Sequence, residues 1–597
     1  MNNSDFIAKF LSSNGYNTAF GVTGGGAMFL NEAFRKNKKI NFIFTHHEQS
    51  AAMAAEAYCR IKKKPAVLSI TSGPGGTNAI TGVIGAWVDS VPMIIISGQV
   101  ESKDMILKSG TRQIGIQEAN IYEIIKPITK YAKVLKTSSD IEKELKIAVI
   151  ISKQGRPGPV WLDIPLDVQS QKFSKKKINF KINETFSNNK SLRKNDKKKI
   201  LRVHKLIKNS KRPLVLIGNG IHLGDAEKEF LRFLKISQLP FLSSWNASDI
   251  VASNHKLNFG RPGLFGNRIS NFAIQSCDLL IILGCRLSVP ITGYQIKNFS
   301  PNSKKIYIDI DQKEILKRNF KVNLKLNFDV KIFLRFFNSY IKNKKLSLKL
   351  SWIEKLEKLK LDLDEDKKYL NQKNFINSFN FINELSKTLK GNENIVTDMG
   401  TSFTCTMQAF KTKKNQRLFT SSGIAAMGFG LPGLLGSYFA DKKKIPICIT
   451  GDGGLMFNIQ ELQTIRNYKI PAKIFIINNG GYLTMKLMQK KNFKKFVGAD
   501  DQSGLTLPNF SKISKAFGFS FKKITNAKNI KQDLIKIFKS KQPLICEVMI
   551  PKLQDLVPRV QTQMNKDGSF EPAMIDNMYP FIEKTYLNII RQKLMKN

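Results

Sequence analysis

The chain has 597 residues, of which 42% are hydrophobic and 10% aromatic, so it is too long for one core and we expect several domains. It carries 96 Lys and Arg against 46 Asp and Glu, a formal net charge of +50, which by itself is typical of proteins that bind nucleic acids or anionic surfaces. The lysines are spread over the whole chain, however, and no stripe alternates them with stacking aromatics. We therefore interpret the charge as solvated surface and expect no nucleic-acid partner.

The cysteines and the apolar segments exclude two further classes of protein. The six cysteines form neither a C-x-x-C pair nor a cysteine–histidine cluster, which argues against a disulfide framework or a structural zinc site. No apolar stretch reaches the ~18 residues that span a bilayer, and the N-terminal segment lacks a basic region followed by an apolar core. We therefore expect inert core thiols in a soluble, cytoplasmic protein with no membrane partner.

The first domain is expected over residues 1–170. Helical patterns there alternate with short apolar runs at 42–44, 66–70 and 93–98, each of which ends near Gly, Ser or Thr. This alternation predicts parallel strands joined by helices. The Lys-, Asn- and Ser-rich run that follows, 170–199, predicts a solvated linker.

A second α/β unit is expected over residues 190–345. Its apolar strands are predicted at 214–218, 279–284 and 305–311. The stretch 341–374 carries charge at helical spacing and predicts an amphipathic connecting helix.

A third α/β unit is expected over residues 372–550, followed by a tail, 551–597, without a strand pattern. The tail predicts an extended arm that ends in a helix. The expected fold class is α/β, with three doubly wound domains built on parallel sheets. The strands of the third unit are predicted at 394–398, 446–452, 473–479 and 543–550.

A turn rich in glycine follows the strand at 446–452, with the sequence Gly451-Asp452-Gly453-Gly454, and the next strand ends at Asn478-Asn479. Because the carboxyl ends of parallel strands open onto one edge of a sheet, the Asp452 carboxylate and the Asn479 amide can meet one hard cation there. The glycines let backbone N–H groups approach a phosphate at a helix N-terminus. Oxygen ligands beside an anion cradle indicate a diphosphate held through Mg²⁺.

This spacing resembles the thiamin diphosphate (ThDP) signature of the acetolactate synthase superfamily. The resemblance implies that Asp452, Asn479 and the carbonyl of Gly481 hold the metal, with Gly453 and Gly454 beside the cofactor. Matches to the family run over nearly all of residues 5–550. They imply a pyrimidine-binding domain, a central domain and a diphosphate-binding domain.

Two stretches near the N-terminus, 20–34 and 45–100, are similar to the family's pyrimidine-binding domain. The resemblance implies a cofactor contact at Gly25 and makes Glu48 the glutamate that activates the cofactor. The alternative for Glu48 is a first-turn carboxylate that stabilises a helix N-terminus. His46 and His47 either line the site or make structural hydrogen bonds.

Gln117 matches a family glutamine near the substrate, and its alternative is a solvated loop side chain. The segment 421–436 resembles the family's cofactor-bending segment. There Met427 corresponds to the bulky residue under the cofactor, with core packing as the alternative, and the Ala425 carbonyl to the acceptor for the 4′-amino group. The family's Gln-His diphosphate contact is replaced by Thr401-Ser402, whose hydroxyls can donate to phosphate.

The central unit resembles the family's flavin-binding domain at Gly218-Asn219-Gly220, at 260–268, at Gly284-Cys285-Arg286 and at Asp309-Ile310-Asp311. The family's charged residues after Arg286 are replaced by Leu287-Ser288-Val289-Pro290. The resemblance implies either bound FAD or a vacant relic of its site, with a structural role, and contacts at Arg286 and Asp309.

Together these matches imply decarboxylation of a 2-oxo acid, with pyruvate expected, and transfer of the two-carbon unit to a second carbonyl, as in branched-chain amino-acid biosynthesis. Glu48 and Asp452 fall in different domains, which in this family face each other across a subunit contact. The resemblance therefore implies an active site at the subunit interface of a homodimer or homotetramer.

The stretches 478–509 and 567–581 are more similar to synthase-like proteins of surface-polysaccharide assembly, in which the acceptor is a nucleotide-linked keto sugar. Met488 stands nine residues after Asn479, where biosynthetic members carry a Trp that favours 2-oxobutyrate. Met488 predicts weak discrimination, unless Phe493 replaces the Trp. A third hypothesis is an inactive regulatory or nucleic-acid-binding protein with the same fold.

Overall fold

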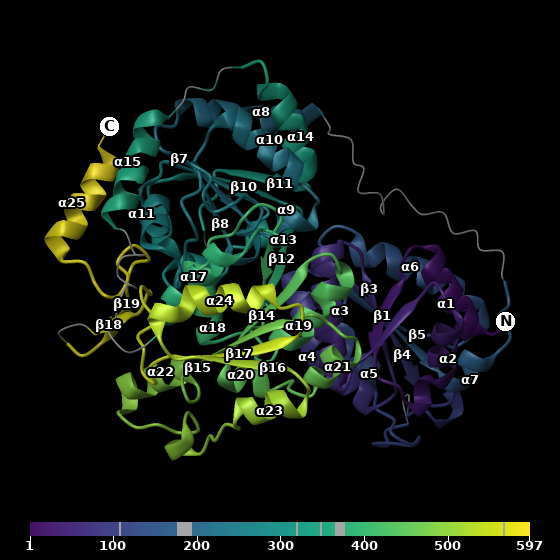
Figure 1. Ribbon diagram of the computed structural model, residues 1–597. Coiled ribbons are helices and arrows are strands. Elements are labelled where there is room, and N and C mark those ends of the chain that lie inside the picture. The colour runs from purple at the N-terminus through teal and green to yellow at the C-terminus, as the bar shows by residue number, and fades with distance from the viewer. Residues whose placement is uncertain are drawn as a thin grey trace.

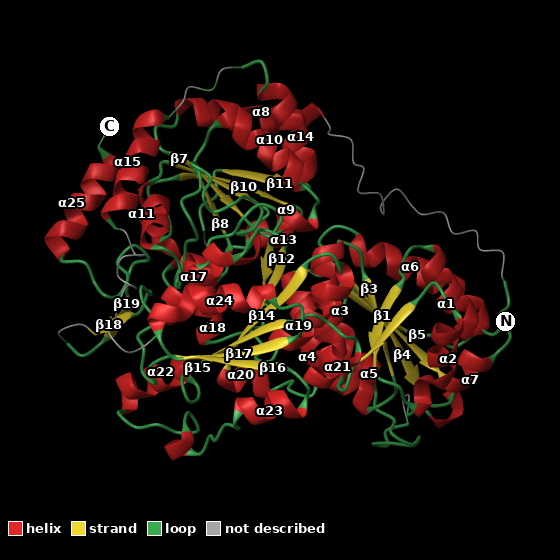
Figure 2. Ribbon diagram, viewed as in Figure 1, coloured by secondary structure: helices red, strands yellow, loops and turns green. Residues whose placement is uncertain are grey.

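The computed structural model describes residues 1–106, 109–175, 194–317, 320–344, 346, 349–363, 376–564 and 567–596. It contains three parallel sheets with flanking helices, which lie around a common junction (Figure 1, Figure 2). The predicted α/β class is confirmed. The predicted domain limits at 190, 345 and 372 lie outside the described residues, as does most of the predicted linker.

The N-terminal sheet is buried on both faces. Met93 and Ile95 of its strand β4 enter one apolar cluster, while Ile94 and Ile96 enter another on the opposite face. Such continuous apolar strands are typical of parallel sheets covered by helices on both sides. The strand order is β2 (Asn41–Phe44), β1 (Thr18–Gly21), β3 (Ala66–Ile70), β4 (Met93–Gln99), β6 (Pro159–Pro165) and β5 (Tyr131–Val134). The helices are α1 (Asn3–Ser13), α2 (Met28–Lys36), α3 (Glu48–Lys62), α4 (Pro74–Asp89), α5 (Ile121–Ile125), α6 (Ile141–Lys153) and α7 (Leu166–Ser170).

The central sheet has five strands and its first helix, α8 (Lys194–Asn209), begins inside the predicted linker. The linker prediction is therefore wrong for 194–199, because Ile200, Val203 and Ile207 bury one face of this lysine-rich helix at helical spacing. The strand order is β11 (Leu324–Asn327), β10 (Lys304–Asp309), β9 (Leu279–Leu283), β7 (Pro213–Ile217) and β8 (Phe241–Ser243). The other helices are α9 (Gly220–Leu223), α10 (Glu227–Ser237), α11 (Arg268–Ser276), α12 (Val289–Thr292), α13 (Gln312–Leu316), α14 (Val330–Ile341) and α15 (Leu350–Asp362).

The C-terminal sheet repeats the strand arrangement of the N-terminal one. In both, the crossovers that leave the second and third strands of the sheet order run in opposite directions, which creates an open edge at the carboxyl ends of these two strands. The strand order is β13 (Arg417–Phe419), β12 (Glu393–Thr397), β14 (Ile445–Gly451), β15 (Lys473–Asn478), β17 (Leu544–Met549) and β16 (Ser520–Ile524). The helices are α17 (Ser378–Thr388), α18 (Thr401–Ala409), α19 (Gly430–Ala440), α20 (Asp452–Met456), α21 (Glu461–Asn467), α22 (Leu483–Phe493), α23 (Phe510–Ala516) and α24 (Ile530–Lys539).

The tail ends in helix α25 (Lys584–Met595), as predicted, and this helix lies beside α15 on the central domain (Figure 1). The prediction that the tail lacks strands is wrong. Strands β18 (Thr562–Met564) and β19 (Phe570–Pro572) form an antiparallel pair. Three residues are too few for an alternating pattern, so this pairing has no periodic signature in the sequence.

The N-terminal and C-terminal domains share one core where α3 packs against α19 (Figure 1). Helix α3 is rich in alanine, so the two helix backbones approach closely. A Cβ atom on Gly436 of α19 would lie 1.9 Å from the carbonyl oxygen of Ala54. A side chain at position 436 would therefore force the two domains apart.

All six cysteines are free and buried, which agrees with the expectation of inert core thiols. Burial raises the pKa of the Cys277 thiol to about 11 and that of the Cys59 thiol to about 12. Within the described ranges, a helix long and apolar enough to cross a membrane is absent.

Candidate functional site

The predicted metal ligands meet at the carboxyl ends of the neighbouring strands β14 and β15. Asp452 is 1% exposed, and its Oδ2 atom accepts hydrogen bonds from the backbone N–H groups of Asn479 and Gly481, both at 3.0 Å. Its Oδ1 atom accepts one from the N–H of Gly453 at 2.8 Å. Burial raises the pKa of Asp452 above its usual range, while these donors act in the opposite direction. The carboxylate therefore anchors the loop that contains Asn479 and Gly481.

Two acceptors in this loop remain available to a cation. The Oδ1 atom of Asn479 is buried and has no hydrogen-bond partner. A carboxylate offers about four acceptor positions, and the three N–H donors leave one on Asp452. Buried acceptors without a donor are costly, and oxygen ligands of this kind suit Mg²⁺. The residues present therefore fit a magnesium ion.

This donor set differs from a cluster of acidic, histidine or cysteine side chains. Within the described part of the chain, no group of three or more His, Cys, Asp or Glu side chains is placed to hold a metal. Here a single carboxylate would be joined by an amide and a backbone carbonyl, which leaves room for an anion in the remaining coordination positions.

The glycines of the loop are required by close packing. A Cβ atom on Gly453 would lie 2.2 Å from the ring of Tyr482. Gly481 has φ +130°, in the left-handed region, and a Cβ atom there would lie 2.1 Å from the Ala499 carbonyl oxygen. On Gly454 it would lie 3.0 Å from Asp398 Oδ2. These contacts hold the turn in one shape.

Thr401 and Ser402 begin α18 at the end of β12, the strand beside β14, and both are buried. The Ser402 hydroxyl donates to the carbonyl of Asp398 at 3.1 Å, so its proton is directed at the backbone. The first N–H groups of this nine-residue helix have no partner within the helix. They provide the donors for an anion at the same sheet edge.

The segment predicted to bend the cofactor, 421–436, is fixed by hydrogen bonds to two other parts of the C-terminal domain. Ala425 has φ +59°, which is unusual for a residue with a side chain, and Met427 is half-buried against the C-terminal core. The Gly428 N–H donates to Asp398 Oδ1 at 2.9 Å, and the Gly428 carbonyl accepts from the Asn458 amide at 2.8 Å.

Asp398 is a site residue that the sequence analysis missed. It also accepts from the Thr450 hydroxyl at 3.0 Å, and burial raises its pKa to about 6. It thus links β12 and β14 to the segment that contains Met427. The available signal was its position directly after an apolar strand, the same position that drew attention to Asp452.

Glu48 begins α3 in the N-terminal domain and is 9% exposed. Its carboxylate accepts from the Asn78 amide of α4 at 3.0 Å. The His47 ring caps α3 by accepting from the Gln49 N–H at 3.1 Å, so it has a structural role. The His46 N–H donates to Glu461 of the C-terminal domain at 3.2 Å.

Gly25 and Gln117 are both exposed in the N-terminal domain; Gly25 begins a short 3₁₀ helix, Gly25–Ala27, and Gln117 lies in a turn. A Cβ atom on Gly25 would meet open space, so packing does not require a glycine there. Gln117 has φ +59°, and its carbonyl oxygen would lie 2.0 Å from a Cβ atom on Gly73. Gln117 therefore has a sparsely populated backbone conformation of the kind found at functional sites.

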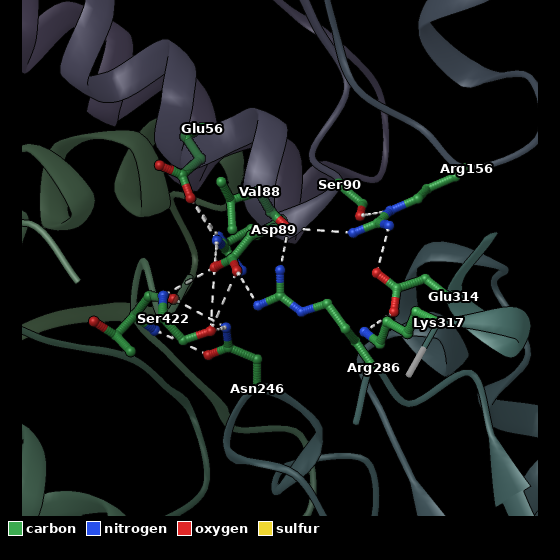
Figure 3. Close-up of polar contacts among 12 residues, drawn as sticks. Glu56, Val88, Asp89, Ser90, Arg156, Asn246, Arg286, Glu314, Lys317 and Ser422 are labelled. Atoms are coloured by element: carbon green, nitrogen blue, oxygen red, sulfur yellow. Dashed lines mark hydrogen bonds and ion pairs between the residues drawn. The ribbon is translucent and has the colours of Figure 1, made fainter. Parts of the chain in front are cut away.

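Arg286 and Asp309 line a separate cavity of about 250 Å³, where the three domains meet. Arg156 of the N-terminal domain donates to Asp311 at 3.1 Å and to Glu314 at 2.8 Å on the central domain. Arg286 donates to the Val88 carbonyl at 2.8 Å (Figure 3). Burial raises the pKa of Asp309 to about 6. Ion pairs and hydrogen bonds therefore connect the walls of this cavity.

Asp89, the last residue of α4, joins all three domains at the same place. It is paired with Arg60 of its own domain at 2.7 Å and with Arg286 of the central domain at 3.8 Å. It also accepts from the Ser422 N–H of the C-terminal domain at 2.9 Å, and Figure 3 shows Asp89 between Arg286 and Ser422. Ser422 lies shortly before Ala425 and Met427.

Three family models match the chain in the order of its sheets. Residues 1–121 match the thiamine pyrophosphate enzyme, N-terminal TPP binding domain. Residues 200–337 match the central domain of these enzymes, and residues 398–548 match the C-terminal TPP binding domain.

The chain is 32% identical to the probable acetolactate synthase large subunit of Methanocaldococcus jannaschii, over 99% of this chain and 98% of that protein. The chain belongs to the acetolactate synthase large-subunit family. It is also 29% identical to the acetolactate synthase large subunit of Lactococcus lactis, over 94% of this chain and 95% of that protein. Acetolactate synthase 1, chloroplastic, of Nicotiana tabacum is 29% identical, over 96% of this chain and 85% of that protein.

The family membership decides between the classes of function. This acetolactate synthase-like chain is a ThDP-dependent enzyme, a transferase in the broad sense, rather than an inactive protein with the same fold. ThDP is its cofactor.

Proposed function

We propose that the enzyme decarboxylates pyruvate and transfers the two-carbon unit to a second carbonyl compound, with ThDP bound through Mg²⁺. The observation that carries this proposal is the buried, unpartnered Asn479 Oδ1 atom beside the anchored Asp452 carboxylate. When bound, ThDP supplies the nucleophilic carbon and the electron sink for decarboxylation.

In this proposal Asp452, Asn479 and the Gly481 carbonyl hold Mg²⁺. The N–H groups of Thr401 and Ser402 at the start of α18 and of Gly454 in α20 would donate to the diphosphate, while Gly453 lets the Asp452 turn pack closely. Ala425 and Met427 support the bent cofactor, and the left-handed φ of Ala425 sets the direction of its carbonyl.

Glu48 is the proposed proton-transfer partner of the cofactor's pyrimidine ring. Its carboxylate is largely buried and held by Asn78, which fixes its orientation without adding a charge. Gly25 and Gln117 line the same side of the site in this proposal, with Gln117 near the substrate.

We propose that each active site combines Glu48 of one chain with Asp452 of a second chain, in a homodimer or in a homotetramer of such pairs. A large exposed apolar side chain lies close in sequence to a residue of each half of the proposed site. Ile116, which is 89% exposed, precedes Gln117, and Phe457, which is 50% exposed, follows shortly after Asp452. A second copy of the chain would cover them.

Mixing two inactive variants tests this shared site. Glu48→Gln and Asp452→Ala are each expected to lose turnover, but heterodimers formed after subunit exchange contain one intact Glu48–Asp452 pair. Partial recovery of acetolactate formation from pyruvate is the expected result. If each chain contained a whole site, mixing would recover nothing.

The central cavity does not fit a whole FAD. Its volume of about 250 Å³ is below the ~300–1,000 Å³ of pockets that bury drug-sized ligands, and FAD is larger than these. Arg286 is engaged by Val88 and Asp89, and Arg156 by Asp311 and Glu314. We therefore favour a relic of the flavin site over bound FAD, and no step of the reaction is assigned to flavin.

A keto-sugar acceptor, as in surface-polysaccharide synthesis, is the second candidate. It is favoured by the surface of α22, where Met488 is 58% exposed and Phe493 is 72% exposed. In this proposal the two exposed side chains leave room for a bulky acceptor beside α22. Product analysis with pyruvate and a panel of acceptors, combined with native mass spectrometry for ThDP, tests both candidates.

A further inference from the structure

Lys486 is a buried lysine beside the loop that contains Asn479 and Gly481, and the proposed function does not use it. It lies in the first turn of α22, seven residues after Asn479, and is 1% exposed. Its Nζ atom donates to the backbone carbonyls of Asn479 at 2.9 Å and Gly480 at 3.4 Å. Burial of an ammonium group is costly unless it is compensated, and two neutral carbonyls compensate it only in part.

The charges around Lys486 include those of the proposed metal site. Asp452 and Asp500 attract the ammonium group, Asp501 adds a weaker attraction, and Lys552 repels it. The carboxylates of Asp452 and Asp500 already accept other donors: Asp452 accepts backbone N–H groups, and Asp500 accepts the N–H and the hydroxyl of Ser503. Lys486 therefore balances charge here through space.

The backbone held by Lys486 is the part of the loop with the most conformational freedom. Gly480 and Gly481 have φ +70° and φ +130°, and a pair of glycines loses more conformational entropy on ordering than any other pair of residues. The two carbonyls that Lys486 holds directly precede the Gly481 carbonyl. Fixing them restricts the direction in which the Gly481 carbonyl and the Asn479 side chain can point.

A bound diphosphate adds a second reason for a cation. The diphosphate carries more negative charge than one Mg²⁺ ion neutralises, and Asp452 adds another negative charge in a buried place. The low local dielectric makes an uncompensated charge costly. A fixed ammonium group beside the loop offsets that excess.

We propose that Lys486 is a positioning residue of the diphosphate–metal site, which clamps the Asn479–Gly481 turn and offsets the negative charge of Asp452 and the diphosphate. The proposal rests on the proposed function of Asp452, Asn479 and Gly481. It predicts that Lys486 strengthens binding of the diphosphate end of the cofactor and does not affect binding of thiamin, which lacks the diphosphate.

The test compares Lys486→Met, which removes the charge and the donors at similar length, with Lys486→Arg, which keeps both. Lys490→Met is the matched control, because Lys490 is exposed on the same helix. Binding of Mg²⁺–ThDP, of Mg²⁺–pyrophosphate and of thiamin to the cofactor-free protein is measured by titration calorimetry. Thermal unfolding of each cofactor-free protein reports its folding.

We expect Lys486→Met to weaken binding of Mg²⁺–ThDP and Mg²⁺–pyrophosphate by roughly tenfold or more. Thiamin binding and the KM for pyruvate at saturating cofactor should stay unchanged, and Lys486→Arg should recover most of the loss. If Lys486→Met does not fold, Lys486→Gln replaces it, with the same expected loss. Diphosphate binding by the folded Met or Gln variant that equals that of Lys490→Met would overturn the proposal.

Asp452→Ala separates this proposal from the one on which it rests. If Asp452→Ala retains Mg²⁺-dependent ThDP binding, the assignment of Asp452 as a metal ligand is wrong. If Asp452→Ala loses binding while the Lys486 variants bind normally, only the role of Lys486 is wrong.

Discussion

The hydroxyl of Ser50 donates to the side-chain oxygen of Asn458 at 2.9 Å, and this bond ties the helix that begins at Glu48 to the C-terminal domain. The amide of Asn458 in turn donates to the Gly428 carbonyl, next to Met427. One buried side chain therefore connects the proposed proton-transfer helix to the segment proposed to bend the cofactor.

We expect Asn458→Ala to weaken ThDP binding and to lower the midpoint of thermal unfolding, Tm. The substitution removes the Ser50–Asn458 bond and leaves the buried Gly428 carbonyl without its partner, at a cost of about 1–3 kcal/mol for the unsatisfied carbonyl. Calorimetric titration with ThDP and differential scanning calorimetry measure the two effects. Ser50→Ala is the control, since it removes only the first bond. Equal behaviour of the two variants would show that the Gly428 contact contributes nothing.

Glu48→Gln should keep the fold and ThDP binding but lower turnover by about 10²–10⁴-fold. The amide keeps the size of the side chain and its contact with Asn78, but it cannot take part in proton transfer. Acetolactate formation from pyruvate, together with cofactor content by mass spectrometry, measures the effect. Near-normal turnover would remove Glu48 from the reaction.

Asp163 should make the stability of the N-terminal domain depend on pH. It is buried on β6, with the Ser97 hydroxyl and the Gln99 amide as donors, and burial raises its pKa from 3.8 to about 7. Between these values the folded chain binds more protons at this site than the unfolded chain. Its contribution to the free energy of unfolding is therefore present at low pH and is lost as the pH rises through about 7.

The comparison with Asp163→Asn isolates this effect from other titrating groups. We expect the Tm of the wild-type protein, relative to that of Asp163→Asn, to fall between about pH 4 and about pH 7 and to level off above that range. A difference that stays constant over this range would show that Asp163 keeps an ordinary pKa.

Position 488 should control the choice between pyruvate and 2-oxobutyrate as acceptor. Wild-type protein, with an exposed and flexible Met488, is expected to show little preference, because one methylene is worth only ~1–3 kcal/mol even in a well-shaped pocket. Met488→Trp should raise the preference for 2-oxobutyrate by roughly tenfold. Competition experiments with both products quantified measure it, with Lys490→Trp as control. A strong 2-oxobutyrate preference in the wild type would contradict this view.

Purified protein should contain no flavin, and added FAD should leave its Tm unchanged. Arg156→Ala should lower the Tm, because it removes ion pairs between the N-terminal and central domains. Absorbance spectra and thermal unfolding with and without FAD check both statements. A yellow protein that loses its flavin on Arg286→Ala would restore the flavin assignment.

The strands of the parallel sheets could be predicted closely from the sequence. The runs 66–70 and 473–479 correspond to β3 (Ala66–Ile70) and β15 (Lys473–Asn478), because strands buried on both faces read as continuous apolar runs. The same reasoning placed Asp452 and Asn479 at one sheet edge, which the hydrogen bond between them supports. What the sequence could not show was how these residues are held.

Asp398, Asn458 and Lys486 escaped prediction for a common physical reason. Each acts through hydrogen bonds to backbone groups, either of a loop that follows a strand or of a segment from another part of the chain. Such bonds depend on backbone directions, which leave no pattern of residue types. The junction at Asp89 escaped for a different reason, since its partners lie far apart in the sequence, in three domains.

The burial of all six cysteines gives this protein a practical property. Every native thiol is shielded from solvent and is a poor nucleophile, because burial disfavours the thiolate that reacts with maleimides. A cysteine introduced at the exposed positions 116 or 493 would therefore be the main reactive thiol of the folded chain. A fluorophore attached there could follow the association of two subunits and the arrival of substrates without first removing the native cysteines.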